Sequence, residues 1–184
     1  MDAAALTEKG AGSFAPPASV LSGLVATAQT RRQQLKTRFI IATIGSIIMS
    51  AAVSPIMAAY WFLAVSASQI IDIYAWSGFT EPERDAPPSR REWIVLCFSA
   101  FQAATIYSIF PVLLWGHWAE PGKIFAVLWL AGSLLHVTMH MHHEKRTFLA
   151  AAIPHTVYFF ALPAYSLVTG DSPGRIGSLA IILS

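Results

Sequence analysis

Four of the six histidines in this chain fall within eight residues, in the stretch HVTMHMHH that runs from His136 to His143. On a helix, His136, His140 and His143 would share one face, because they are separated by four and three residues. Imidazoles on a shared face are ligands that zinc, copper or haem iron could use. One helix usually supplies only two ligands to one metal, and a closed site needs more. The three histidines are candidate metal ligands, but we expect no bound metal or other cofactor.

The same stretch continues into HHEKRT, from His142 to Thr147, which is similar to the phosphoacceptor box of histidine kinases. Phe148 stands where that box usually has proline, and apolar segments flank the motif closely on both sides. A phosphoacceptor histidine must reach a soluble ATP-binding domain, which a short loop at a membrane surface cannot easily do. We therefore interpret the cluster as the polar, partly cationic end of a membrane helix, where cations are favourable.

Other polar side chains lie inside apolar segments, where an ionisable residue is costly and marks a functional site by default. The candidates are Asp72, Gln102, His136 and His155. All four would lie in the same half of the bilayer, and Gln69 is one turn from Asp72. We predict that Asp72 pairs with His136 or His155 in the bundle interior. The alternative, in which each group is satisfied separately by snorkelling or by a backbone carbonyl, stays open.

Composition indicates what surrounds these residues. Of 184 residues, 55% are hydrophobic and 12% are charged, with a formal net charge of +2. Soluble domains carry about a quarter charged residues, so lipid is the expected solvent and the lipid bilayer the main partner, with no nucleic acid. The single cysteine, Cys97, excludes an internal disulfide framework and any multi-cysteine metal site.

The apolar segments predict an all-α fold, a polytopic transmembrane helical bundle. Crossing a bilayer takes about 20 residues of helix. Five full spans are expected over residues 39–53, 55–76, 93–115, 124–141 and 148–168. A sixth begins at residue 176 and stops at Ser184, after a rise of only about 14 Å. We therefore expect the sequence to be a fragment cut inside its sixth span.

The N-terminal region divides into two parts. Residues 1–17 are small or polar and are expected to form a disordered tail. Residues 18–38 predict a basic juxtamembrane or amphipathic helix that leads into the first span. Basic residues are retained on the cytoplasmic side of a membrane, so their positions predict a multi-pass protein with a cytoplasmic N-terminus. One side would carry Lys9, Arg31, Arg32, Lys36, Arg38, Arg84, Arg90, Arg91, Lys145 and Arg146, and the other only Lys123 and Arg175.

The segment WLAGSLLHVTMHMHHEKRTFLAAAIPHTVYFFALPAYSLV resembles the N-terminal membrane region of alphaproteobacterial sensor histidine kinases, often hybrid ones. The shared features are a fourth span that ends in a polar tract, a basic turn, and a fifth span with spaced prolines. The similarity covers residues 31–184 and contains no catalytic signature. It implies a location in the bacterial inner membrane, a homodimer, and a kinase core beyond this chain. That core would bind ATP and act on a response regulator or receiver domain.

Three functions remain open at this point. The first is the membrane-embedded sensory or anchoring region of a two-component histidine kinase, with the catalytic core absent from this chain. The second is a small polytopic transporter or membrane enzyme that uses Asp72, Gln102, His136 and His155. The third is a metal- or haem-binding membrane protein that uses the histidine stripe. The sequence has no phosphate-binding glycine loop and no Ser-His-Asp or Cys-His constellation, so we expect no catalytic residues in this chain.

Overall fold

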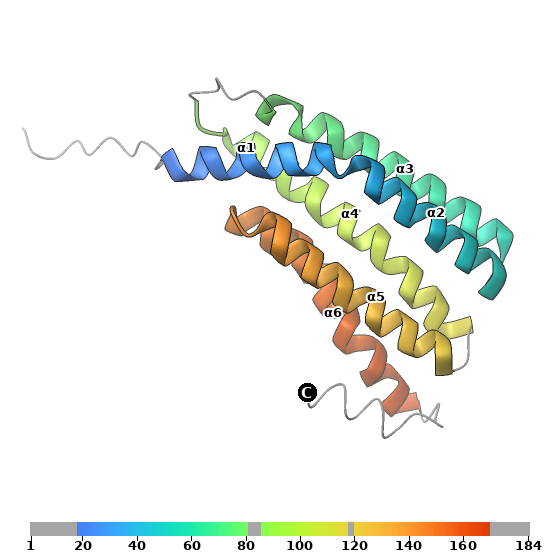
Figure 1. Ribbon diagram of the computed structural model, residues 1–184. Coiled ribbons are helices and arrows are strands. Elements are labelled where there is room, and N and C mark those ends of the chain that lie inside the picture. The colour runs from blue at the N-terminus through green and yellow to red at the C-terminus, as the bar shows by residue number, and fades with distance from the viewer. Residues whose placement is uncertain (1–17, 81–85, 118–119, 170–184) are drawn as a thin grey trace, which may run out of the picture.

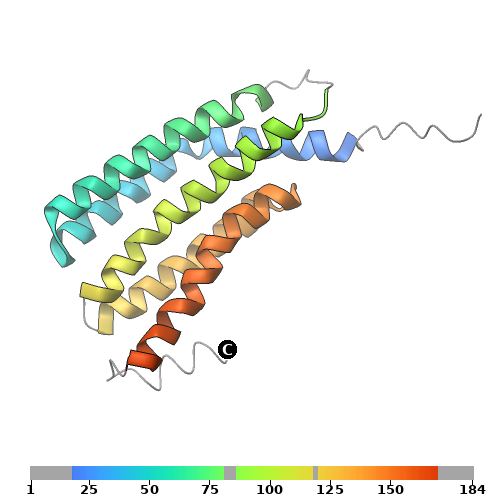
Figure 2. The same ribbon diagram turned by 180° about the vertical axis from the view of Figure 1, so that it is seen from behind.

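The chain folds into a bundle of α-helices, shown in Figures 1 and 2. The computed structural model describes residues 18–80, 86–117 and 120–169, and within them it contains helices and no strands. The elements are α1 (Ala18–Gln33), α2 (Leu35–Ala52), α3 (Pro55–Trp76), the 3₁₀ turn η1 (Ser77–Phe79), α4 (Arg90–His117), α5 (Glu120–Met141) and α6 (Lys145–Thr169). The helices α2 to α6 are long and apolar enough to cross a membrane. The predicted all-α, multi-pass fold is confirmed for these five spans.

The span boundaries differ mainly at the first helix. The predicted span 55–76 coincides with α3, and the next three observed helices begin three or four residues before the predicted ranges and end within two residues of them. The segment 18–38, expected as one helix, is divided at Gln34, after which α2 begins. Two basic residues, Lys36 and Arg38, therefore stand in the first turn of a spanning helix rather than before it. The predicted tail 1–17 and the incomplete span 176–184 lie outside the described residues.

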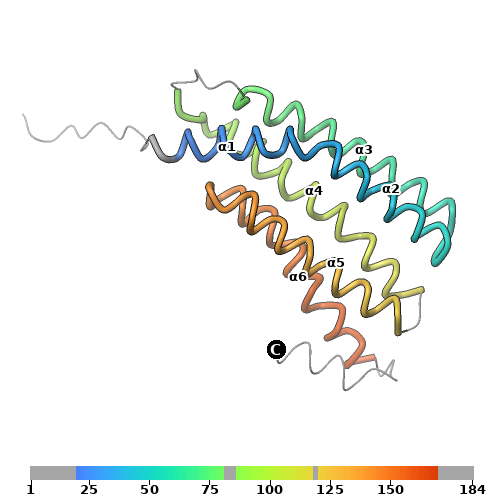
Figure 3. The backbone as a smooth tube through the Cα atoms, in the orientation of Figure 1, coloured from blue at the N-terminus to red at the C-terminus, as the bar shows by residue number. Residues whose placement is uncertain are grey.

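The five spanning helices are arranged around α4. It packs against α3 on one side and against α5 and α6 on the other, while α2 pairs with α3. We call the end of the bundle where α1 lies the α1 end; the α3–α4 and α5–α6 connections are also there, as the tube in Figure 3 shows. Among the described residues, the basic side chains lie at this end except Lys123, which is at the start of α5. The predicted segregation of charge is thus seen in the fold.

The turn between α2 and α3 shows how local sequence shapes this arrangement. Ser54 has an extended backbone (φ −169°, ψ 137°), and Pro55 follows at the first position of α3. Proline suits that position because its fixed φ is helical and its missing N–H would have no partner there. The amides of Val53 and Ser54 both donate to the carbonyl of Met49, at 2.8 and 3.1 Å. The chain therefore reverses direction within two residues.

The bundle is apolar outside, and inside it buries polar side chains among apolar ones. Large apolar side chains face outward on the spanning helices, for example Ile47, Leu63 and Phe98, each more than 60% exposed. Serine, threonine and charged or amide side chains are buried instead, namely Ser68, Gln69, Asp72, Ser99, Ser108, Thr147, His155 and Ser166. This distribution would be unstable in water and is the one expected in lipid, where polar groups must find partners within the bundle.

A tight helix crossing in the bundle depends on Gly45 of α2. A Cβ atom at this position would lie 2.9 Å from Cη2 of Trp61 on α3. The indole cannot easily move away, because its Nε1–H donates to the carbonyl of Ile106 at 2.8 Å and its ring packs against Phe110. Small residues at such crossings let helix backbones approach closely in membranes.

We predict that Gly45→Ala destabilises the bundle relative to Gly132→Ala by about 1–3 kcal/mol, the usual cost of overpacking. Both substitutions gain about 1 kcal/mol of helix propensity, so that gain cancels in the comparison. A Cβ at Gly132 meets nothing within 4 Å, which makes it the matched control. Thermal unfolding in detergent would measure the difference, and equal midpoints for the two variants would contradict the crossing described here.

Candidate functional site

The carboxylate of Asp72, on α3, is the centre of a buried polar cluster. Its Oδ1 accepts hydrogen bonds from Nη2 of Arg31 at 2.5 Å and from Oγ of Ser99 at 2.6 Å. Its Oδ2 accepts from Nε of Arg31 at 2.9 Å and from Nη1 of Arg38 at 3.2 Å. Arg31 therefore binds Asp72 in a bidentate way through Nε and Nη2, a strong and geometrically specific mode. Asp72 joins α1, α2, α3 and α4 at one point.

The two arginines reach Asp72 because they lie on one face of nearly continuous helix. They are seven residues apart, close to two helical turns. The break at Gln34 is slight, since the amide of Gln34 still donates to Thr30 and that of Arg38 to Gln34, each at 3.0 Å. Both guanidinium groups thus point from the α1–α2 junction toward α3.

Arg31 also ties α1 to the rest of the bundle. Its guanidinium carbon lies 5.1 Å from the centre of the Trp76 ring, a cation–π contact, and its Nη1 lies 3.2 Å from Sδ of Met141. Beside it, Leu24 and Ala28 of α1 pack against Trp76, Phe79 and Leu96. The helix α1 is consequently docked by one buried ion pair and one small apolar cluster.

The predicted pairing of Asp72 with His136 or His155 is wrong, because the carboxylate is occupied by two arginines and a serine. His155 of α6 is instead bonded to Ser108 of α4, with 2.7 Å between Nδ1 and Oγ. Ser108 has one hydroxyl hydrogen, and it donates to the carbonyl of Ala104 at 2.9 Å. His155 is therefore the donor through Nδ1, which leaves its Nε2 as an acceptor.

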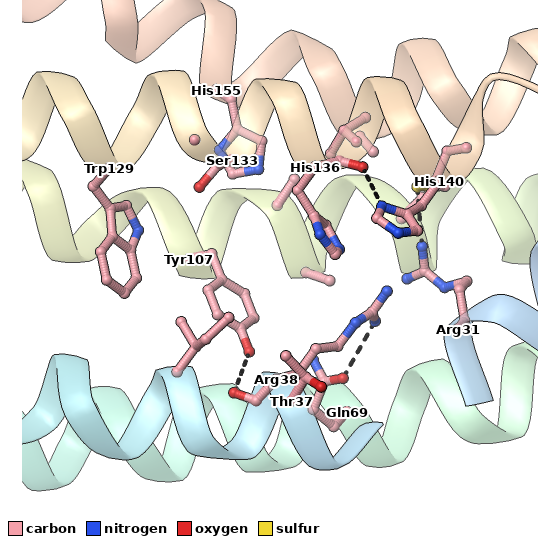
Figure 4. Close-up of a pocket in the computed structure, with 18 of the residues that line it drawn as sticks. Arg31, Thr37, Arg38, Gln69, Tyr107, Trp129, Ser133, His136, His140 and His155 are labelled. Carbon is pink, nitrogen blue, oxygen red and sulfur yellow. Dashed lines mark hydrogen bonds between the residues drawn. The ribbon is translucent and has the colours of Figure 1, made fainter. Parts of the chain in front are cut away.

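Arg31 and Arg38 line one end of a cavity of about 450 Å³ on the α2–α5 side of the bundle, shown in Figure 4. Its size lies within the range of about 300–1,000 Å³ that is usual for small-molecule sites. Figure 4 shows Arg31, Arg38 and Gln69 below the cavity, Tyr107 behind it on α4, and the α5 and α6 side chains above. The remaining lining residues are Thr37, Ile41, Ala100, Ala103, Ala104, Leu128, Trp129, Gly132, Ser133, His136, Val137, His140, Met141, Ala151 and His155.

The cavity opens sideways between α2 and α5. Ile41 on α2 and Leu128 and Gly132 on α5 line it and are exposed at the surface of the bundle. These residues are well inside spanning helices, so the opening faces the region that lipid chains occupy. The opposite wall is closed by Ala100, Ala103 and Ala104 of α4, whose small side chains leave the space.

The histidine stripe does not form the shared face that its spacing predicts. The rings of His136 and His140 are stacked, with centroids 4.4 Å apart, and both line the cavity. His143 lies beyond the end of α5 at Met141 and its ring is paired with that of His142 instead. The Nδ1 of His140 is bonded to the carbonyl of His136 at 2.9 Å. Among the described residues, no three His, Cys, Asp or Glu side chains converge to hold a metal ion.

The structure separates Gln102 from the other predicted polar residues. Its Nε2 donates to Oγ of Ser68 at 3.2 Å and joins α4 to α3, away from the cavity. The predicted residues His136 and His155 line the cavity together with Gln69, and Asp72 lies directly behind the arginines that line it. Three of the four predicted residues are thus brought to one site.

Four residues of the site were not predicted from the sequence, namely Arg31, Arg38, Ser99 and Tyr107. Arg31 and Arg38 were interpreted as markers of membrane sidedness. Their spacing of seven residues, together with a lone carboxylate predicted at similar depth, was the signal that could have paired them with Asp72. Tyr107 donates to the carbonyl of Arg38 at 3.2 Å and so fixes the start of α2 against α4, a contact that nothing in the sequence marks.

The arrangement suits the binding of a small molecule. Within the described residues the cavity presents guanidinium, amide, indole, imidazole, phenol and hydroxyl groups. No protein-family model, no curated protein and no solved structure matches the chain.

We predict that Asp72→Asn destabilises the protein far more than Ser99→Ala. Removing the carboxylate leaves two guanidinium charges in a buried site, and breaking a buried ion pair in this way costs about 3–5 kcal/mol. Ser99→Ala removes one hydrogen bond, worth about 1 kcal/mol. Thermal unfolding in detergent would measure both, with the exposed Arg32→Gln as a neutral control. Equal stability of Asp72→Asn and wild type would show that the cluster does not hold the fold.

Proposed function

We propose that this chain is the membrane-embedded sensory region of a two-component histidine kinase, and that the cavity between α2 and α5 receives the signal. The observation that carries the proposal is that one cluster serves two purposes. Arg31 both docks α1 through Asp72 and lines the cavity, and Arg38 lines the cavity while sharing the same carboxylate. A molecule that enters the cavity therefore meets the groups that position α1.

The geometry offers a way to transmit binding. The cavity is lined by residues of α1 to α6, and an occupant would contact both α2 and α5, which pack against other helices rather than closely against each other. A ligand shifts a conformational equilibrium only through different contacts in the two states. Here the two states would differ in whether Arg38 binds Asp72 or the occupant, while Arg31 stays on Asp72. Small shifts of packed helices are a common form of such transitions.

The resemblance in sequence supplies the rest of the proposal. It implies a homodimer in the bacterial inner membrane, and the positions of the basic residues predict a cytoplasmic N-terminus. A kinase core that binds ATP would follow the sixth span and transfer phosphate to a response regulator or receiver domain. In this view the α1 end of the bundle faces the cytoplasm, and the basic residues gathered there contact anionic headgroups.

A second candidate, a small transporter or membrane enzyme, is favoured by one observation. The cavity holds ionisable side chains from α5 and α6, His136, His140 and His155, next to a buried carboxylate inside the membrane-spanning region. Intramembrane groups of this kind also form proton and substrate pathways. Reconstitution in liposomes with a pH-sensitive dye separates the two functions: proton flux that His136→Gln, a change outside the charge cluster, abolishes supports transport.

The coding sequence beyond residue 184 gives the most direct test. We expect a completed sixth span, a dimerisation helix with a phosphoacceptor histidine and an ATP-binding domain. In that full-length protein, Arg31→Gln should change the rate of autophosphorylation by roughly fivefold or more, because coupling free energies between sites are typically about 1–3 kcal/mol. Arg32→Gln, on the same helix but exposed, should leave the rate unchanged. A stop codon directly after the sixth span would contradict the proposal.

A further inference from the structure

The charges around the cavity do not balance. Two guanidinium groups, of Arg31 and Arg38, are ion-paired to one carboxylate, of Asp72, which leaves a net charge of +1. Both arginine side chains are largely buried, with exposed fractions of 7% and 14%. No second acidic side chain is paired with either of them in the part of the chain that the structure describes. An unbalanced charge in a site of low polarity is costly, and a bound anion would compensate it.

The unmet positive charge belongs to Arg38 rather than to Arg31. Arg31 uses Nε and Nη2 on Asp72 and places Nη1 against Met141. Arg38 uses only Nη1, at 3.2 Å from Asp72 and 3.4 Å from Oε1 of Gln69. Its Nε and Nη2 have no acceptor among the described residues, and its side chain lines the cavity. Figure 4 shows this guanidinium between Gln69 and the ring of His136.

Hydrogen-bond donors without acceptors also gather around the cavity. The Nε2 of Gln69 and the Nε1 of Trp129 are buried without a partner in the described structure, and both residues line the cavity. Buried donors nearly always find an acceptor, so their lack of one here calls for an explanation. The imidazoles of His136 and His140 can act as donor or acceptor. These donors and the unused Nε and Nη2 of Arg38 suit an acceptor-rich group such as a carboxylate or phosphate, while the hydroxyls of Thr37 and Ser133 on the lining can donate or accept.

The rest of the cavity suits an apolar chain. Besides Arg38, the lining includes the small Ala103 and Ala104 and the exposed Ile41, Leu128 and Gly132, at which it opens toward lipid. A headgroup at the arginine would thus place an attached chain along apolar walls and out between α2 and α5. A small water-soluble anion would leave those walls without a contact.

We propose that the cavity binds an amphipathic anion: a carboxylate or phosphate head on Arg38, joined to a single apolar chain that leaves between α2 and α5. This deepens the proposed function by naming the class of the signal, and it rests on that function only in taking the cavity as the binding site. The head could belong to a free fatty acid or to an anionic lipid of the bilayer, which share this chemistry. The bidentate fork of Arg38 matches either group.

The test uses the purified 184-residue chain in nanodiscs of phosphatidylcholine, a zwitterionic lipid. Binding is followed by quenching of Trp129, which lines the cavity, with 12-bromododecanoate against the neutral 12-bromododecanol. The signal of a Trp129→Phe variant corrects for quenching of the other tryptophans. We expect dodecanoate to bind at least about tenfold more tightly than dodecanol, since the charged head adds a bidentate hydrogen bond. Dodecyl phosphate should displace the bromododecanoate.

Four variants make the result specific. Arg38→Gln should weaken dodecanoate binding by about tenfold or more, and Arg38→Lys less, because lysine keeps the charge but loses the fork. Gly132→Phe should block binding without touching the charge cluster, since a side chain at Gly132 has open space. Arg32→Gln, exposed on α1, should bind as wild type does. Circular dichroism confirms that each variant is helical before it is compared.

The outcomes distinguish a bilayer lipid from a free acid as the source of the anion. They also distinguish failure of the anion proposal from failure of the proposed sensory function. Anionic lipid that co-purifies with wild type but not with Arg38→Gln, and that weakens dodecanoate binding in phosphatidylglycerol nanodiscs, identifies a bilayer lipid; its absence identifies a free acid. Equal binding of dodecanol and dodecanoate, or binding that Arg38→Gln does not weaken, would contradict the proposal that the ligand is an anion. If Gly132→Phe still blocks dodecanol, the cavity remains a binding site and only the ligand class is wrong. Autophosphorylation of the full-length protein that Gly132→Phe leaves unchanged would overturn the sensory role itself.

Discussion

The ion pair between Asp72 and Arg31 is the interaction on which the arrangement of this bundle depends. A carboxylate inside a membrane helix is tolerated only when it is paired and fully hydrogen-bonded. Asp72 meets that requirement with four contacts from three other helices. Meeting it fixes α1 across the end of α3, fixes the start of α2 against α3, and fixes the depth of α4 through Ser99. Few apolar contacts could fix the relative positions of four helices in this way, because apolar packing has little directional preference.

The far half of the bundle is held by different means. There Trp61, Phe110 and Trp129 pack as neighbouring rings, with Trp61 and Phe110 centred 5.1 Å apart and Phe110 and Trp129 4.6 Å apart. This aromatic group joins α3, α4 and α5, whereas the charge cluster joins α1 to α4 at the other end. Between the two, α4 presents three alanines and Tyr107 toward α2 and α5. The cavity is the space that remains where neither the charged nor the aromatic contacts reach.

The sequence predicts well how deep in the membrane a residue lies. It predicts poorly how each helix is rotated about its axis. Length and hydropathy place the spans, so Asp72, His136 and His155 were expected at similar depth, and His136 and His155 do line one cavity beside the arginines that bind Asp72. Which groups face each other depends on how helices turn about their axes, and that is decided by packing. Asp72 could not be assigned to arginine rather than histidine for this reason. The stripe through His143 failed for a local reason, because the helix ends two residues earlier.

The unequal roles of the two arginines link the cavity to α1. Arg31 grips Asp72 with two bonds, whereas Arg38 has a single bond of 3.2 Å to an oxygen that Arg31 also uses. An anion that draws Arg38 away therefore leaves the Arg31 pair intact and gives it sole use of the carboxylate. The electrostatic repulsion between the two guanidinium groups then falls as well, because the anion neutralises the charge of one of them. Occupation of the cavity would thus tighten the docking of α1. By linkage, any partner that binds α1 in its docked position would raise the affinity of the cavity by the same factor.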